Sequence, residues 1–268
     1  MKVSGALKAA QQVLATANIS SGRLDSELLL CHLLKQNRSW LIAHSQDELA
    51  PEQHELYKAL INKRALHTPV VHLTNKREFY GIELYIDDAV LTPRVETEKM
   101  VELAIKHAPV RGKLIDIGTG SGAIAIAIAT HRPDLKVCAT EYSPEALAVA
   151  RKNIAISKLD VTLTQADLFE GVQGQFDVVV CNLPYLSDDA DLMPEVQKEP
   201  GVALFGGPDG LSVYRRFLSQ LTEHLAPGGQ LFTECDPWQQ AALVAEAQAI
   251  GLSLSHEDYF ILGFVLKI

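Results

Sequence analysis

A glycine-rich loop is the first segment of the chain whose residue types could bind a ligand. It comprises Gly118, Thr119, Gly120, Ser121 and Gly122, directly between an apolar strand pattern and a helical one. Glycines let the chain turn sharply and bring bare backbone against a ligand at the positive end of the following helix. With Ala123 the loop also satisfies the dinucleotide-binding pattern GxGxxG/A, so it does not by itself identify the ligand.

Glu141 lies 23 residues after Gly118, where the next apolar strand ends. An acidic side chain there can accept hydrogen bonds from both ribose hydroxyls of a nucleoside ligand, although an acid at a strand end can also simply be solvated. The loop and Glu141 together predict a cofactor that contains adenosine, without showing which one.

The tetrapeptide Asn182-Leu183-Pro184-Tyr185 limits the chemistry further. It follows the apolar run FDVVVC, so Asn182 is expected at the carboxyl end of a strand, where open α/β sheets bind ligands. A planar NH2 group can be aimed at a sulfonium methyl group when two acceptors hold its hydrogens. The Asn182 side-chain oxygen and the Leu183 carbonyl can be those acceptors, Pro184 stiffens the turn, and Tyr185 offers a flat apolar surface. The tetrapeptide therefore predicts direct methyl transfer to a planar nitrogen.

The elements that position these residues alternate between strand and helix after Lys113. Strands are expected at LIDI, KVCATE, VTLTQ, FDVVVCN, GQLFTE and in the last residues through FILGFVLKI. Helices are expected at AIAIAIAT, PEALAVARKNIA, 212–225 and 238–250. This alternation predicts an α/β domain whose mostly parallel sheet is covered on both faces.

The first 75 residues show helical spacing of apolar positions instead. One face of the first helix is expected to carry Leu7, Ala10, Val13 and Leu14. SELLLCHLL indicates a second helix, and Pro51 begins a third at the position that suits proline. We therefore expect a small all-helical domain at residues 1–75.

The residue composition changes between Pro69 and Thr92, and this stretch predicts a β-hairpin linker. The stretches VVHLT and EFYGIELYI are β-branched and aromatic, and Asn75-Lys76 supplies a turn. Pro93 ends the stretch, and helical spacing resumes in VETEKMVELAIKHA. The expected division is a helical substrate-docking domain at 1–75, a linker at 76–92 and the main domain at 93–268.

Composition and charge restrict the class of protein. A hydrophobic fraction of 47% with 21% charged residues is ordinary for a globular protein, and no long apolar run predicts a membrane span. Residues 1–80 hold 10 Lys/Arg against 7 Asp/Glu, and the remainder holds 14 against 26. The acidic balance after residue 80 argues against contact with a nucleic-acid phosphate backbone and favours a protein partner. Cysteine and histidine spacings predict no metal, and a polar N-terminus without a signal peptide predicts a cytoplasmic protein.

Together these motifs resemble class I methyltransferases that act on planar nitrogens, and more narrowly the release factor glutamine methyltransferases (PrmC/HemK family). The similarity runs nearly end to end, and it includes EFYG, LTPRVETE, DIGTGSGAIAIAIA, SPEALAVARKN, ADLFE, NLPY, EPGVALFGGPDGL and LAPGGQLFTE. LTPRVETE and EPGVALFGGPDGL are not general methyltransferase features, so they make the resemblance specific.

The resemblance implies a Rossmann-like, mostly parallel seven-stranded sheet that binds S-adenosyl-L-methionine and releases S-adenosyl-L-homocysteine. It implies that the glycine-rich loop holds the methionine part, that Glu141 holds the ribose, and that Asp167 and Leu168 flank the adenine. Asn182, Leu183, Pro184 and Tyr185 would hold the glutamine of a Gly-Gly-Gln loop, with Arg94 and Glu96–Glu98 as a pocket wall. The implied partner is a class I peptide chain release factor, bound by a monomer, in support of translation termination.

One departure from the family pattern keeps a rival in view. The family usually has N-P-P-Y, whereas this chain has Leu183 in place of the first proline. N-L-P-Y is also the form seen in ribosomal RNA adenine dimethyltransferases, so the alternative is an enzyme that methylates the exocyclic amine of adenine in RNA or DNA. Such an enzyme would be expected to add a basic, aromatic module, which is not evident here. A catalytically silent binding module is a further alternative, but it would be expected to lose cofactor or acceptor residues that this chain retains.

Overall fold

The computed structural model describes residues 1–267, which form two compact units. The first comprises Met1–Lys76 together with Leu192–Lys198, and the second comprises Arg77–Asp191 together with residues 199–267. The chain therefore leaves the second unit after Asp191, contributes a short segment to the first, and returns at Glu199. Nothing in the sequence pattern predicted this excursion.

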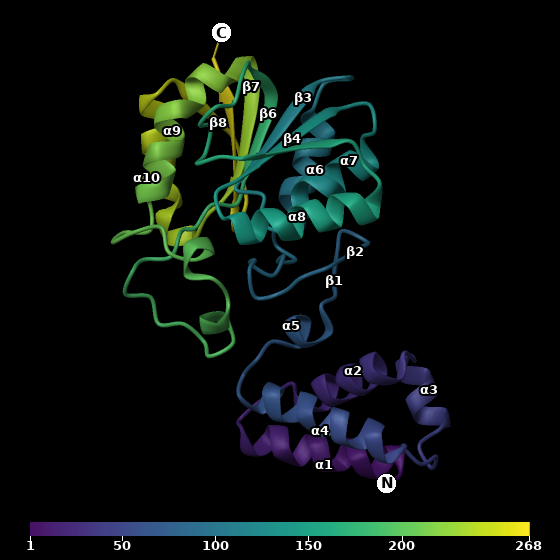
Figure 1. Ribbon diagram of the computed structural model, residues 1–268. Coiled ribbons are helices and arrows are strands. Elements are labelled where there is room, and N and C mark those ends of the chain that lie inside the picture. Colours follow the sequence, from purple (N-terminus) through teal and green to yellow (C-terminus); the bar gives the residue numbers. More distant parts are fainter. Residues whose placement is uncertain (268) are drawn as a thin grey trace. The chain divides into compact units, whose positions relative to one another are not determined.

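The first unit is helical, as expected. Its helices are α1 (Val3–Thr16), α2 (Gly22–Leu34), α3 (Arg38–Ala43), α4 (Pro51–Ala65) and α5 (Val70–Thr74) (Figure 1). The core includes Leu14, Leu29, Leu30, Tyr57 and Ile61, so α1, α2 and α4 pack around one apolar centre. Helix α3 was not predicted, although Asn37 marks its start by accepting a hydrogen bond from the Trp40 backbone N–H at 2.9 Å.

Two details of this unit differ from the prediction. The buried face of α1 carries Val3, Ala6, Ala10 and Leu14, whereas Val13 is exposed. The stretch VVHLT is helix α5 and not a strand: Pro69 precedes its first turn and Asn75, at a φ of 55°, ends it in the left-handed conformation. The β-branched composition was thus overridden by the proline and asparagine that bracket a single helical turn.

A charge cluster around the buried Arg64 holds the segment Leu192–Lys198 in the first unit. The Arg64 side chain is buried, and its Nε donates to Asp25 at 2.7 Å. Its Nη2 also pairs with Glu195, which lies in that segment. Because a buried guanidinium is costly without partners, the two carboxylates account for its position.

The second unit begins with a two-stranded hairpin, β1 (Arg77–Phe79) and β2 (Ile82–Leu84). Its turn is formed by Tyr80 and Gly81, both at positive φ, as a two-residue hairpin turn of type I′ requires. The turn predicted at Asn75-Lys76 is therefore wrong by five residues. The hairpin clusters with the sheet unit and not with the helices.

The main sheet has seven strands in the order β5-β4-β3-β6-β7-β9-β8. They are β3 (Lys113–Ile117), β4 (Lys136–Glu141), β5 (Val161–Gln165), β6 (Phe176–Cys181), β7 (Leu225–Glu234), β8 (Leu252–Glu257) and β9 (Ile261–Leu266). All neighbours from β5 to β7 are parallel, and β9 is antiparallel to both β7 and β8. The predicted mostly parallel seven-stranded sheet is confirmed.

Helices cover both faces of the sheet (Figure 1). One face carries α6 (Glu98–His107), α7 (Ala123–His131) and α8 (Pro144–Ser157), and the other carries α9 (Ser212–His224) and α10 (Gln240–Ala249). Helix α7 is buried from Ala123 to Ala129, which explains why its sequence is apolar all round. Because helices cover both faces, the accessible parts of the sheet are the two sides, or edges, at which its strands begin and end.

The carboxyl ends of the central strands meet at one such edge. The last residue of β3, Ile117, pairs with Thr140 of β4 and with Cys181 of β6, and Cys181 pairs with Thr233 of β7. The residues that follow these strands are therefore neighbours in space. They include the glycine-rich loop, Glu141, Asn182 and Glu234.

Candidate active site

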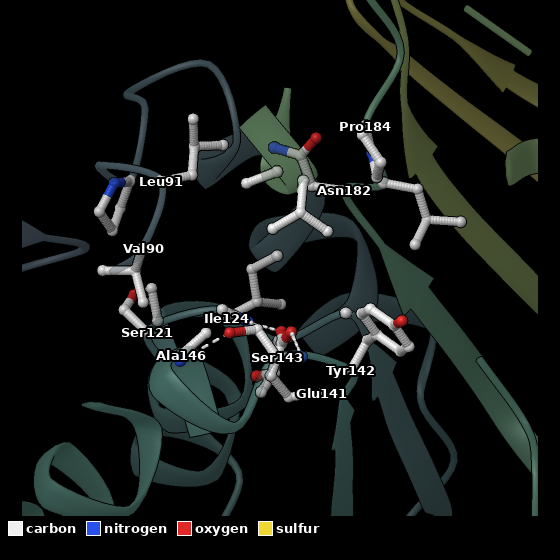
Figure 2. Close-up of a pocket in the computed structure, with 18 of the residues that line it drawn as sticks. Val90, Leu91, Ser121, Ile124, Glu141, Tyr142, Ser143, Ala146, Asn182 and Pro184 are labelled. Carbon is white, nitrogen blue, oxygen red and sulfur yellow. Dashed lines mark hydrogen bonds between the residues drawn. The ribbon is translucent and has the colours of Figure 1, made fainter. Parts of the chain in front are cut away.

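A cavity of about 330 Å³ lies at this edge, and all of its lining residues belong to the second unit. Its volume falls in the range of about 300–1,000 Å³ that is usual for small-molecule sites. The predicted site residues that line it are Arg94, Gly118, Thr119, Gly120, Ser121, Glu141, Asp167, Leu168, Asn182, Leu183 and Pro184. Gly122 and Tyr185 are not among the lining residues. In Figure 2, Asn182 and Pro184 lie on one side of the cavity and Glu141 with Ser143 on another.

Glu141 is held rigidly beneath the glycine-rich loop. Its carboxylate accepts hydrogen bonds from the backbone N–H of Gly120 at 2.8 Å and of Ser143 at 2.9 Å. Burial raises the pKa of Glu141, while the hydrogen bonds from Ser143 and Gly120 oppose that rise. The carboxylate is thus fixed, and its remaining lone pairs can accept two hydroxyl groups from a ligand in the cavity.

Gly120 of the glycine-rich loop leaves open space where another residue would place a side chain. Gly118 and Gly120 both have positive φ, at 71° and 57°. A Cβ atom on Gly120 would meet no heavy atom within 4 Å, so the backbone there borders open space. This arrangement provides the bare backbone cradle that the sequence pattern indicates.

Asp116 supports this loop from below and is fully buried at the end of β3. Its Oδ2 accepts from Thr119 Oγ1 at 2.5 Å and from the Ala125 backbone N–H at 3.2 Å. Within the described chain its Oδ1 has no hydrogen-bond partner. Burial raises the pKa of Asp116 to about 7. The side chain therefore ties the loop to the first turn of α7 at an electrostatic cost.

The side chain of Asn182 connects to a polar cluster behind the cavity. Its Nδ2 lies 3.4 Å from Thr97 Oγ1, which donates to Glu234 Oε2 at 2.6 Å. The other oxygen of Glu234 accepts from the Tyr185 hydroxyl at 3.2 Å. Burial raises the pKa of Glu234, and its hydrogen bonds, that from Thr97 foremost, oppose the rise. Tyr185 is thus connected through Glu234 to Thr97 and Asn182.

The segment that contains FGGPDG packs backbone against backbone on the 182–185 loop. Leu186 donates to the Leu204 carbonyl at 2.9 Å, and Gly206 donates to the Leu186 carbonyl at 2.8 Å. A Cβ atom on Gly206 would lie 2.4 Å from the Pro184 carbonyl oxygen, which no real side chain permits. Gly206 and Gly210 of EPGVALFGGPDGL are therefore explained by close contact with the 182–185 loop, since a Cβ atom on Gly210 would likewise lie 2.1 Å from the Tyr185 carbonyl oxygen. We call residues 182–185 the acceptor loop.

The carbonyls of that loop differ in what they meet. The Pro184 oxygen faces Gly206, and the Tyr185 oxygen accepts from Gln239 Nε2 at 2.8 Å. Leu183 carries its side chain inward, where it is buried in the core of the sheet unit. The Tyr185 carbonyl is thus engaged by a hydrogen bond and the Pro184 carbonyl lies close to Gly206, whereas the carbonyl of Leu183 stays the predicted acceptor for a ligand.

Charged residues at the remaining walls are paired. Arg94 pairs with Glu199 at 2.5 Å, and Asp167 pairs with Arg216 at 2.5 Å. Leu168, buried beside Asp167, has a φ of 56°, a strained value for leucine that is typical of functional loops. One oxygen of the Asp167 carboxylate is therefore already bound to Arg216, and the other is left for a ligand.

The expected wall at 96–98 is only partly found. Thr97 lines the cavity, whereas Glu96 is exposed and Glu98 accepts from the Tyr80 backbone N–H at 2.9 Å. The sequence reasoning also missed Glu234 and Glu199. Glu234 follows an apolar strand just as Glu141 does, so the same rule could have found it. Glu199 has no such local signal.

Two features are absent from residues 1–267. No helix among them is long and apolar enough to cross a membrane. No group of His, Cys, Asp and Glu side chains among them could hold a metal ion.

Comparisons with known proteins agree along most of the chain. A family model described as "PrmC N-terminal domain" matches residues 5–74, and one described as "Methyltransferase small domain" matches residues 97–199. A release factor glutamine methyltransferase from Deinococcus radiodurans is 37% identical over 94% of this chain and 92% of its own length. One from Xylella fastidiosa is 38% identical over 87% of this chain and 86% of its own length.

Solved structures support the fold. A methyltransferase from Pyrococcus furiosus superposes with a TM-score of 0.59 at 20% identity, covering 77% of this chain and 99% of that one. A Thermus thermophilus 16S rRNA methyltransferase in complex with AdoMet and guanosine superposes with a TM-score of 0.52 at 16% identity, covering 72% and 56%. At these identities the likeness shows a shared class I methyltransferase fold.

Proposed function

Since this chain belongs to the release factor glutamine methyltransferase family, it is an S-adenosylmethionine-dependent protein-glutamine N-methyltransferase, and we propose that it methylates the glutamine of the Gly-Gly-Gln motif of peptide chain release factors. The single observation that carries this proposal is the cavity in which the glycine-rich loop, Glu141 and Asn182 meet. A nucleoside-binding end and an amide-binding end then lie within one space.

The cofactor end fits S-adenosyl-L-methionine by its chemistry. The backbone around Gly120 would hold the methionine part, the fixed carboxylate of Glu141 would accept the ribose hydroxyls, and Asp167 and Leu168 would flank the adenine. When bound, this cofactor supplies an electrophilic methyl group on a sulfonium.

The acceptor end suits a planar carboxamide. Asn182 Oδ1 and the Leu183 carbonyl would each accept one N–H of the glutamine side chain, and this would orient its nitrogen lone pair. Pro184 lines the cavity beside them, and the Tyr185 hydroxyl holds the cluster behind Asn182. The contribution of these residues is positioning and exclusion of water, because the amide proton can leave as the new bond forms.

The helical unit is the part that we propose to dock the release factor. Residues 1–80 carry a net positive balance on an otherwise acidic chain, which suits an acidic partner surface. We propose further that the enzyme modifies release factors as a monomer in the cytoplasm. It would support translation termination by modifying them.

The test is methyl transfer from labelled cofactor to purified release factor, with mass spectrometry to locate the methyl group. Asn182→Ala should lower kcat at least 100-fold, as loss of one oriented polar group at a reacting centre commonly does, with cofactor affinity little changed. Glu141→Ala should instead weaken cofactor affinity. Equal loss of both properties in the Asn182 variant would count against its role, and methylation of free ribosomal RNA in place of the protein would favour the adenine alternative.

A further inference from the structure

A three-residue hydrogen-bond chain lies behind the acceptor loop. Asn182 Nδ2 is 3.4 Å from Thr97 Oγ1, and Thr97 Oγ1 is 2.6 Å from Glu234 Oε2. Thr97 and Glu234 are 3% and 2% exposed, so water does not replace either partner readily. The three residues come from the start of α6, the end of β7 and the end of β6, segments far apart in sequence.

The donors and acceptors of this chain can be assigned from elementary chemistry. The Glu234 carboxylate receives two hydroxyl groups, one from Thr97 and one from Tyr185, and the Asn182 side chain also reaches it as a hydrogen-bond donor. A threonine hydroxyl has a single proton, and once Thr97 gives it to Glu234 its oxygen can only accept. Toward Thr97, Asn182 must therefore present its NH2 group and not its oxygen.

Thr97 directs its hydroxyl to this contact and not to the cap of helix α6. It occupies the N-cap position of α6, where a threonine hydroxyl normally accepts from a backbone N–H of the first turn. Here the side chain makes no such capping bond and is turned to Glu234 instead. Its backbone is helical, with a φ of −66° and a ψ of −20°, whereas a capping residue is typically extended, so the hydroxyl is available to Glu234.

We propose that Thr97, with its proton committed to Glu234, is a positioning residue that fixes the amide orientation of Asn182. With the NH2 group held at Thr97, the Asn182 oxygen is the atom left for the cavity. The inference rests on the proposed function, because a glutamine NH2 needs an acceptor there. A reversed Asn182 would offer two N–H donors to another NH2 group and could not hold it.

The kinetic test compares two substitutions at Thr97 with a matched control. Thr97→Val keeps the shape but removes the acceptor, and it should lower kcat for a Gly-Gly-Gln peptide about tenfold, the value of one hydrogen bond. The Kd for S-adenosylmethionine should stay within twofold. Thr97→Ser keeps a hydroxyl and should recover most of kcat. Thr92→Val is the control, since this buried hydroxyl five residues earlier has no hydrogen-bond partner in the described chain.

A spectroscopic readout separates this inference from the proposed function. In the free protein the side-chain NH2 signal of Asn182, identified by its loss in Asn182→Asp, should show one proton protected from solvent exchange. That protection should fall at least tenfold in Thr97→Val, where Glu234 is the remaining acceptor, and it should be kept in Thr97→Ser and Thr92→Val. If wild type transfers no methyl group to any Gly-Gly-Gln substrate, the proposed function fails while the exchange result still decides the orientation.

Two outcomes would overturn the inference. One is a Thr97→Val enzyme whose kcat stays within twofold of wild type with unchanged protection at Asn182. The other is a Thr97→Ser enzyme as impaired as Thr97→Val, because shape and not the hydroxyl would then be decisive.

Discussion

We predict that Asp116 lowers the free energy of unfolding of the sheet unit as the pH rises. The size of this decrease follows from the burial of its carboxyl. Its carboxyl is fully buried and one of its oxygens has no partner in the described chain, so burial raises its pKa from an ordinary 3.8 to about 7. The folded state then binds this proton more tightly than the unfolded chain does. Its contribution to stability is complete below pH 3.8 and is lost as the pH rises through 7.

The magnitude follows from the two pKa values. At about 1.36 kcal/mol per tenfold change in proton affinity, the full effect is on the order of 4 kcal/mol, and roughly 3 kcal/mol of it falls between pH 4.5 and pH 8. Asp116→Asn cannot ionise, so its free energy of unfolding lacks this component. Relative to wild type, the variant should therefore gain roughly 3 kcal/mol over that interval, whatever its starting stability.

The assay is denaturant unfolding without cofactor, followed by tryptophan fluorescence. The chain has two tryptophans, Trp40 in the helical unit and Trp238 in the sheet unit, so a Trp40→Phe background reports on the sheet unit alone. Asp160→Asn, at an exposed position, is the matched control, and its effect should vary with pH by less than about 0.5 kcal/mol. Parallel stability curves for wild type and Asp116→Asn from pH 4.5 to pH 8 would refute the reasoning.

Two further predictions concern the acceptor site and the helical unit. Gly206→Ala would place a Cβ 2.3 Å from the Gly210 carbonyl oxygen and 2.4 Å from that of Pro184, so the acceptor loop must shift; kcat should fall at least 100-fold while calorimetry shows nearly unchanged cofactor binding. An unchanged kcat would mean that the loop is not held by this contact. Deletion of residues 1–75 should raise KM for intact release factor far more than for a short Gly-Gly-Gln peptide, whose continued turnover also shows that the remaining chain folds. Similar losses on both substrates would contradict docking by the helices.

The parts of the site that the sequence predicted share one cause. Gly118, Glu141 and Asn182 each follow a short apolar strand, and parallel strands bring their carboxyl ends to one edge. The strand pattern and these residue types were therefore sufficient to place both ends of the cavity. The seven-stranded sheet followed from the same alternation together with the family resemblance.

The parts that escaped prediction depend on contacts between distant segments. Thr97 and Glu234 are 137 residues apart, and only the fold shows that a hydroxyl at the start of α6 donates to a carboxylate at the end of β7. The excursion of Leu192–Lys198 into the helical unit likewise depends on a buried partner, Arg64, that no local pattern indicates. Sequence patterns predict individual helices and strands, whereas these two contacts form between residues of different elements.

Leu183, where relatives of this type usually have proline, shows how the fold can compensate for a departure from a motif. Proline would restrict the unfolded chain and contribute roughly 0.4–1 kcal/mol. Leucine gives that up, yet its side chain is 4% exposed and belongs to the core of the sheet unit, where burial of a leucine contributes about 1.5–3 kcal/mol. A Cβ atom on Gly118 would lie 3.1 Å from Leu183 Cδ2, so the leucine also packs directly beneath the cofactor loop. Leucine in place of proline thus makes the 182–185 loop less stiff but adds a contact between this loop and the glycine-rich loop. The Leu183 backbone carbonyl, which we propose to bind the glutamine amide, is kept.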